Sequence, residues 1–155
     1  APGQGTTFRV YLPRTNSVAE PATSLPPSAA ATLRGSETVL VVEDDEQVRV
    51  TVCTILRRHG YDVLDAQNGG EAFLVCEKHD GKIDLLLTDV VMPKMNGREL
   101  AGRLTATRPS MRVLYVSGYA EDSIVHRGVL DAGIAFLQKP IQPDTLLRKV
   151  REVLA

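Results

Sequence analysis

Short apolar segments alternate with amphipathic segments from residue 37 to the end of this 155-residue chain. Residues 38–42 and 83–88 are apolar or β-branched along most of their length, which is typical of strands buried on both faces of a parallel sheet. Between these two segments, apolar residues recur at helical spacing, for example at Val48, Val52, Ile55 and Leu56. The pattern predicts strands at 38–42, 61–66, 83–88, 112–116 and 134–138, and helices at 46–59, 69–79, 97–107, 121–131 and 143–154.

Five strands that alternate with five helices predict an α/β fold, a doubly wound parallel sheet with helices on both faces. Right-handed crossovers and the flavodoxin-like (βα)5 strand order 2-1-3-4-5 are the expected solution. Ligands of such sheets bind outside the carboxyl ends of the strands, at the switch point between strands 1 and 3.

Polar residues stand at those carboxyl ends. Glu43 and Asp44 follow the first strand, Asp89 follows the third, Ser117 ends the fourth and Lys139 follows the fifth. Acids brought side by side repel one another unless a cation lies between them. Mg²⁺, a hard ion that prefers oxygen ligands, is the cation that this set favours. The neighbouring acids Asp45 and Glu46 are interpreted as helix-capping residues, since acids favour a helix N-terminus.

Five segments in order, 41–49, 84–93, 96–97, 116–119 and 136–140, resemble the motifs of receiver domains of two-component signalling. The resemblance covers residues 37–155. It implies that Asp89 is the nucleophile that takes a phosphoryl group from a phosphohistidine. It also implies a Mg²⁺ site made by the side chains of Asp44 and Asp89 and the backbone carbonyl of Val91. Glu43 stands where the family usually has its first Asp, and would reach the ion directly or through water.

The same resemblance implies roles for three residues of the last two strands. Lys139 and Ser117 would each bind a phosphoryl oxygen, and the bond between Lys139 and Pro140 would be cis. Ser117 and Phe136 would form the switch: the hydroxyl moves toward the phosphorylated aspartate and the aromatic ring turns inward. The alternative for Phe136 is a plain core residue. The position of Arg49, six residues after Glu43, matches the family pattern and favours Glu43 and Asp44 as the metal pair over Asp44 and Asp45.

The chain is expected to contain three parts. Residues 37–155 form the receiver domain, and residues 14–36, rich in Pro and small residues, read as a linker. Residues 1–13 resemble the last strand of the ATP-binding domain of sensor histidine kinases, with Gly3 and Gly5 before an alternating segment. This remnant alone should bind no ATP.

The favoured interpretation is a phosphoacceptor in a Mg²⁺-dependent phosphorelay, the C-terminal receiver of a hybrid sensor histidine kinase. Its phosphodonor would be the kinase core or a histidine phosphotransfer protein. The alternative is a stand-alone response regulator that binds partners when phosphorylated. A second alternative is a Mg²⁺-dependent phosphohydrolase, but such enzymes usually have a second acid two residues after the nucleophile, where this chain has Val91. A third alternative is a pseudo-receiver that is not phosphorylated, and the complete set of acids, hydroxyl and lysine argues against it. The expected chemistry of the fragment itself is limited to self-phosphotransfer and autodephosphorylation, and a weak homodimer is left open.

Composition and charge indicate which classes of partner and which cellular compartment to expect. A net charge of −1 with dispersed Lys and Arg argues against a nucleic-acid partner. No apolar stretch reaches the roughly 20 residues of a membrane span, and no signal peptide is apparent, so a cytoplasmic protein without membrane contact is expected. Cys53 and Cys76 are interpreted as apolar helix residues, and His59, His79 and His126 as helix-end or helix-surface residues.

Overall fold

A computed structural model describes residues 33–118 and 134–155 of the chain. The predicted helix at 121–131, His126, the kinase-like segment at 1–13 and most of the predicted linker lie outside the described residues. Within the described part, none of the helices is long and apolar enough to cross a membrane.

The sheet has five parallel strands in the order β2-β1-β3-β4-β5, so the predicted flavodoxin-like order is confirmed. β1 and β3 are adjacent, with Val42 opposite Thr88, and the chain therefore reverses its winding between them. The strands are β1 (Thr38–Val42), β2 (Asp62–Ala66), β3 (Leu85–Asp89), β4 (Arg112–Ser117) and β5 (Phe136–Gln138).

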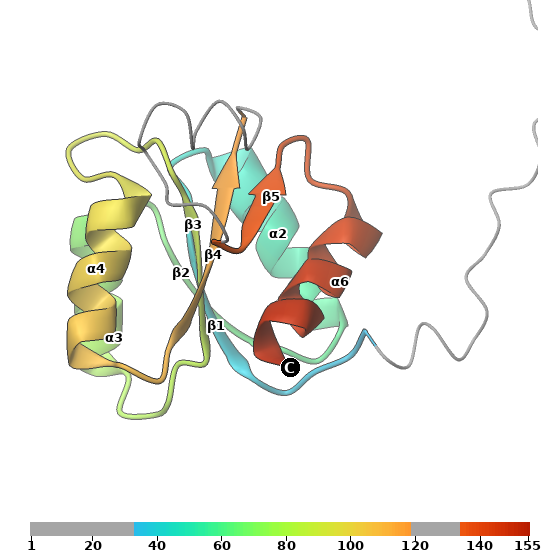
Figure 1. Cartoon of the computed structure of the whole chain (residues 1–155), viewed down its shortest axis with the longest axis horizontal. Helices are drawn as coiled ribbons and strands as arrows, with labels where there is room; N and C mark the ends of the chain where they lie inside the picture. Colours follow the sequence, from blue (N-terminus) through green and yellow to red (C-terminus); the bar gives the residue numbers. More distant parts are fainter. Residues whose placement is uncertain (1–32, 119–133) are drawn as a thin grey trace, which may run out of the picture.

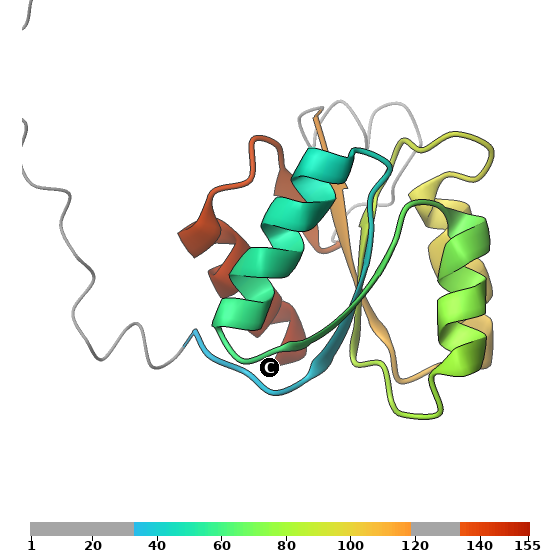
Figure 2. The ribbon, with the colours of Figure 1, turned by 180° about the vertical axis from the view of Figure 1, so that it is seen from behind.

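Four helices cover the two faces of the sheet among the described residues (Figures 1 and 2). They are α2 (Glu46–Arg58), α3 (Gly69–Lys78), α4 (Gly97–Thr107) and α6 (Pro143–Leu154). α2 and α6 lie on one face, and α3 and α4 lie on the other. The predicted ends are correct to within one residue for these helices. Polar caps mark the starts of α2, α3 and α4, and Pro143 stands at the start of α6. The side chains of Asp45, Asn68 and Asn96 each accept a hydrogen bond from the backbone N–H three residues on.

Alternate residues of each strand enter two separate apolar cores. Val39 and Val41 of β1 pack with α2 and α6, whereas Leu40 and Val42 pack with α3 and α4. This is why β1 and β3 read as nearly continuous apolar runs in the sequence. Cys53 and Cys76 are buried in these cores as predicted, and burial raises the pKa of the Cys53 thiol to about 11.

The last residues of the predicted linker pack against the domain. Leu33 is 8% exposed and belongs to the core beneath α2 and α6, and the backbone N–H of Gly35 donates to the carbonyl of His59 at 3.1 Å. Close by, Arg151 of α6 donates to Glu37 Oε1 at 2.7 Å. These contacts gather at the amino ends of the strands, at the pole of the domain opposite the carboxyl ends (Figure 1).

The ion pair between Glu37 and Arg151 predicts a pH-dependent part of the stability. Burial alone would raise the pKa of Glu37, but the hydrogen bond and charge of Arg151, together with hydrogen bonds from backbone N–H groups, outweigh it and lower the pKa below 4.5. A lowered folded pKa stabilises the fold above the unfolded value and loses this contribution as the pH falls through the folded value. Glu37→Gln is therefore expected to reduce the free energy of unfolding at pH 7 by on the order of 1 kcal/mol.

Urea unfolding of both proteins from pH 7 downward would measure this difference, which should shrink once the pH falls below 4.5. Glu152→Gln is the matched control, because Glu152 pairs with Lys149 on the exposed surface of α6, the helix that carries Arg151. An equal effect of the two substitutions, or a difference that does not depend on pH, would contradict the prediction.

Candidate functional site

The carboxyl ends of the strands bring the predicted polar residues together. Glu43 directly follows β1 and is 3% exposed, and Asp89 is the last residue of β3 and is 7% exposed. Ser117, the last residue of β4, is also buried. Burial of two acids at the ends of adjacent strands is costly in free energy unless an opposing charge lies nearby.

Lys139 provides that opposing charge from the segment after β5. Its Nζ lies 2.6 Å from Asp89 Oδ2 and 2.8 Å from Glu43 Oε2. Burial would lower the pKa of Lys139, but its hydrogen bonds to Asp89 and Glu43 outweigh this effect and raise the pKa above 10.5. The lysine is therefore protonated at neutral pH and bridges the two acids.

One lysine does not neutralise the acids of this site. Burial raises the pKa of Glu43, the hydrogen bond from Lys139 opposes this shift, and the nearby charge of Asp89 reinforces it. Asp44 adds a third carboxylate, exposed to solvent, and oxygen atoms of Glu43, Asp44 and Asp89 lie within 4.8 Å of one another. Three clustered carboxylates with surplus negative charge, open to water through Asp44, suit a hard divalent cation such as Mg²⁺.

The sequence suggests two alternatives for the acid run after β1, and the geometry separates them. Asp45 does not join the cluster; its Oδ1 accepts the N–H of Val48 at 3.0 Å and caps α2, as predicted. Glu43 instead faces inward, and its Oε1 accepts the N–H of Asp45 at 3.2 Å. Glu43 and Asp44, rather than Asp44 and Asp45, therefore lie beside Asp89.

Backbone contacts hold Asp89 in a fixed orientation. The N–H of Val91 donates to Asp89 Oδ1 at 2.9 Å, which leaves Oδ2 to Lys139. The N–H of Val90 donates to the carbonyl of Val116 at 2.9 Å, so the loop after β3 stays tied to β4. Val91 itself is 60% exposed at the rim of the site.

The end of β4 is tied to the segment that carries Lys139. The N–H of Lys139 donates to the carbonyl of Ser117 at 2.8 Å, and the bond between Lys139 and Pro140 is cis, as the family resemblance implied. Phe136 is partly buried against the core beneath α3 and α4. Its movement together with Ser117 stays a prediction.

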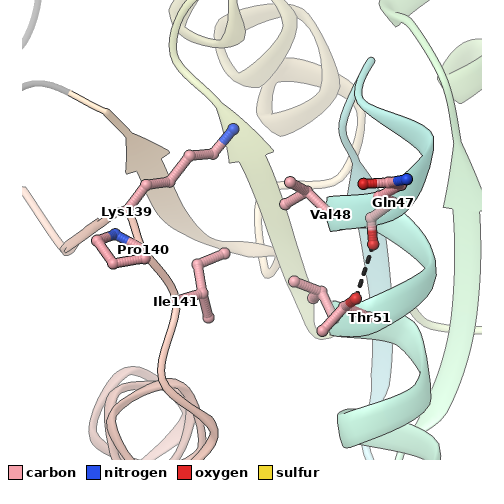
Figure 3. A pocket seen from close by; sticks show the side chains of 7 residues that line it. Gln47, Val48, Thr51, Lys139, Pro140 and Ile141 are labelled. Carbon is pink, nitrogen blue, oxygen red and sulfur yellow. Dashed lines mark hydrogen bonds between the residues drawn. The ribbon is translucent and has the colours of Figure 1, made fainter. Parts of the chain in front are cut away.

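A groove runs beside Lys139, between α2 and the segment that leads into α6. It has a volume of about 480 Å³. Figure 3 shows Lys139, Pro140 and Ile141 on one side and Gln47, Val48 and Thr51 on the other. Lys139 therefore lies between the buried acids and a largely apolar groove.

Two contributors to the site were not anticipated from the sequence. A Cβ added to Gly97 would lie 2.1 Å from the carbonyl oxygen of Asp89, so α4 starts in contact with the backbone of the candidate nucleophile. Arg49, noted in the sequence only for its spacing, donates from Nη1 to the carbonyl of Glu43 at 2.8 Å. A glycine right after the Asn96 cap was a usable signal for the first contact, whereas the second needs the tertiary structure.

Comparison with known proteins agrees with this geometry. Residues 39–151 match the family described as the response regulator receiver domain. Sensor kinase CckA of Brucella abortus is 39% identical over 98% of this chain, which spans 17% of that kinase. The response regulator receiver protein CpdR of the same organism is 30% identical over 75% of this chain and 95% of its own length.

Solved structures of receiver domains and response regulators are also similar to this chain. The crystal structure of the receiver domain from the hybrid histidine kinase CckA is 36% identical over 76% of this chain and 99% of its own, with a TM-score of 0.64. A chain in the crystal structure of a CheX–CheY–BeF3–Mg complex from Borrelia burgdorferi is 26% identical over 77% of this chain and 90% of its own length, with a TM-score of 0.67. The chain belongs to the response regulator receiver domain family.

Proposed function

We propose that this receiver domain accepts a phosphoryl group on Asp89 from a phosphohistidine, in a Mg²⁺-dependent phosphorelay. The observation that carries the proposal is the placement of Asp89 at the centre of the site. Val91 N–H fixes one of its carboxylate oxygens, the Lys139 ammonium lies 2.6 Å from the other, and two further acids adjoin it.

The chemistry follows from these contacts. A carboxylate oxygen of Asp89 attacks the phosphorus atom, the P–N bond of the phosphohistidine breaks, and its electron pair returns to the imidazole nitrogen. Lys139 offers an ammonium to the phosphoryl oxygens, and Ser117 a hydroxyl. Glu43, Asp44 and Asp89, with the Val91 carbonyl, would hold Mg²⁺, which neutralises phosphoryl charge when bound. Ser117 and Phe136 would then convey the phosphorylated state to the surface.

We further propose that this receiver is the C-terminal part of a hybrid sensor histidine kinase that works in the cytoplasm. Its donor would be that kinase's own core or a histidine phosphotransfer protein. Support comes from the extent of the likeness to the sensor kinase, which covers 98% of this chain, against 75% for the response regulator CpdR. The part of the reading frame before the codon for Ala1 is expected to encode an ATP-binding kinase domain. A start codon directly before Ala1 would favour the stand-alone response regulator instead.

Phosphorylation without a partner protein tests the chemistry directly. Incubation with acetyl phosphate and Mg²⁺ should add one phosphoryl group to each chain, because the site supplies both the nucleophile and the opposing charges. Removal of Mg²⁺ with EDTA should reduce labelling to background, since the transferred group carries several negative oxygens beside three acids. Intact-protein mass spectrometry measures both outcomes. Equal labelling with and without Mg²⁺ would contradict the metal's role, and no labelling under any condition would contradict the phosphoacceptor role.

A further inference from the structure

Arg49 of α2 contacts the turn that carries two of the three clustered acids. Its side chain is 14% exposed, and its Nη1 donates to the carbonyl oxygen of Glu43 at 2.8 Å. This carbonyl belongs to the peptide bond that joins Glu43 to Asp44. Its orientation therefore affects the backbone direction of both residues after the end of β1. The amino side of the same turn is held by the N–H of Glu43, which donates to the carbonyl of Ala66 at 3.2 Å.

The other side of the Arg49 guanidinium faces β2. Its Nε lies 3.7 Å from Asp65 Oδ2. Asp65 in turn pairs with Arg57, whose Nη2 lies 3.2 Å from Asp65 Oδ1. The guanidinium thus connects the end of β1 to a side chain of β2, and the negative charge of Asp65 offsets its own positive charge.

We propose that Arg49 is a positioning residue for the cation site: it fixes the Glu43 carbonyl and so holds Glu43 and Asp44 in the arrangement that faces Asp89. This inference rests on the proposed Mg²⁺-dependent function. Groups that orient metal ligands without touching the metal typically change metal affinity by roughly 10–100-fold when they are replaced. Ligands held before the cation arrives lose less conformational entropy on binding.

Charge and position predict opposite results for the loss of Arg49. A guanidinium near a cation site repels the cation, so a pure charge effect predicts tighter Mg²⁺ binding when Arg49 is replaced by a neutral residue. A positioning role predicts weaker binding, because the acids are no longer held. The sign of the change therefore separates the two physical causes.

The test is a titration of metal-free protein with MgCl2 alone at constant ionic strength, followed by NMR shifts of the backbone amides. Arg49→Met is expected to raise the Kd for Mg²⁺ on the order of tenfold. Arg49→Lys keeps the charge but not the planar fork, and is expected to give a smaller rise in the Kd. Arg57→Met is the matched control: Arg57 lies on the same helix and pairs with the same Asp65, but donates to the carbonyl of Val63 on β2 rather than to Glu43.

Each outcome decides the matter. A raised Kd for Arg49→Met with an unchanged Kd for Arg57→Met supports the proposal. An unchanged or lowered Kd for Arg49→Met overturns it, and so does an equal rise in both variants, because the effect would then belong to the α2–β2 contact. If Arg49→Met does not fold, Arg49→Lys carries the same comparison. Absence of Mg²⁺ binding by the wild-type protein would instead overturn the proposed function itself.

Discussion

Replacing Asp89 with Asn is expected to abolish labelling by acetyl phosphate, even at saturating Mg²⁺. An amide has no anionic oxygen to attack phosphorus, so the covalent step has no nucleophile. Asn nearly preserves the shape of Asp, and its oxygen can still accept the N–H of Val91, which donates to Asp89 at 2.9 Å. The loss should therefore be chemical rather than a consequence of unfolding, and thermal unfolding of the variant should show a folded protein.

Asp62→Asn is a suitable control for this experiment. Asp62 is an exposed acid at the start of β2, away from the carboxyl ends of the strands, and its substitution should leave labelling unchanged. Peptide mapping of the labelled wild-type protein should place the phosphoryl group on the peptide that contains Asp89. Labelling of Asp89→Asn at the wild-type stoichiometry would overturn the assignment of the nucleophile.

Gly97→Ala is expected to have the second large effect, although Gly97 carries no chemistry. Its new Cβ would lie 2.1 Å from the Asp89 carbonyl oxygen and 3.0 Å from Thr88 Oγ1. Such a contact forces backbone to move, and overpacking of this kind typically costs about 1–3 kcal/mol of stability. Because the atom displaced belongs to Asp89, the rate of labelling should fall as well.

Gly102→Ala on the same helix is the control for Gly97→Ala. A Cβ at Gly102 would meet no atom within 4 Å, and Ala is favoured over Gly inside a helix by roughly 0.5–1 kcal/mol. This variant should be slightly more stable than the wild type and should be labelled at the same rate. Urea unfolding and a time course of labelling measure the two quantities. Gly97→Ala with wild-type stability and rate would show that the loop can move away without cost.

The sequence predicts the sheet well because the relevant signals are local. Strands buried on both faces read as apolar runs, and Asn or Asp caps mark the helix starts, as at Asn68 and Asn96. The strand starts are less exact: β3 begins at Leu85 rather than Ile83, although Asp84 already forms hydrogen bonds with Thr38 at the amino end of β1.

The site residues were likewise predictable in identity but not in their mutual contacts. The rule that parallel strands meet at their carboxyl ends is enough to place Glu43, Asp89 and Lys139 near one another. It does not predict that one lysine bridges both acids, or that Arg49 holds the turn before Asp44, since these contacts depend on side-chain directions set by packing. The Gly97 contact also depends on the path of a loop that no periodicity describes.

The anchored residues Leu33 to Glu37 fix where the polypeptide enters the domain. That entry lies at the amino ends of the strands, whereas Asp89 lies at their carboxyl ends, on the other side of the molecule (Figure 1). A module joined upstream would therefore be attached at the end of the domain opposite to the Asp89 carboxylate. Lengthening the segment before Leu33 should change the local concentration of such a donor only gradually, since the entropy of closing a loop grows slowly with its length.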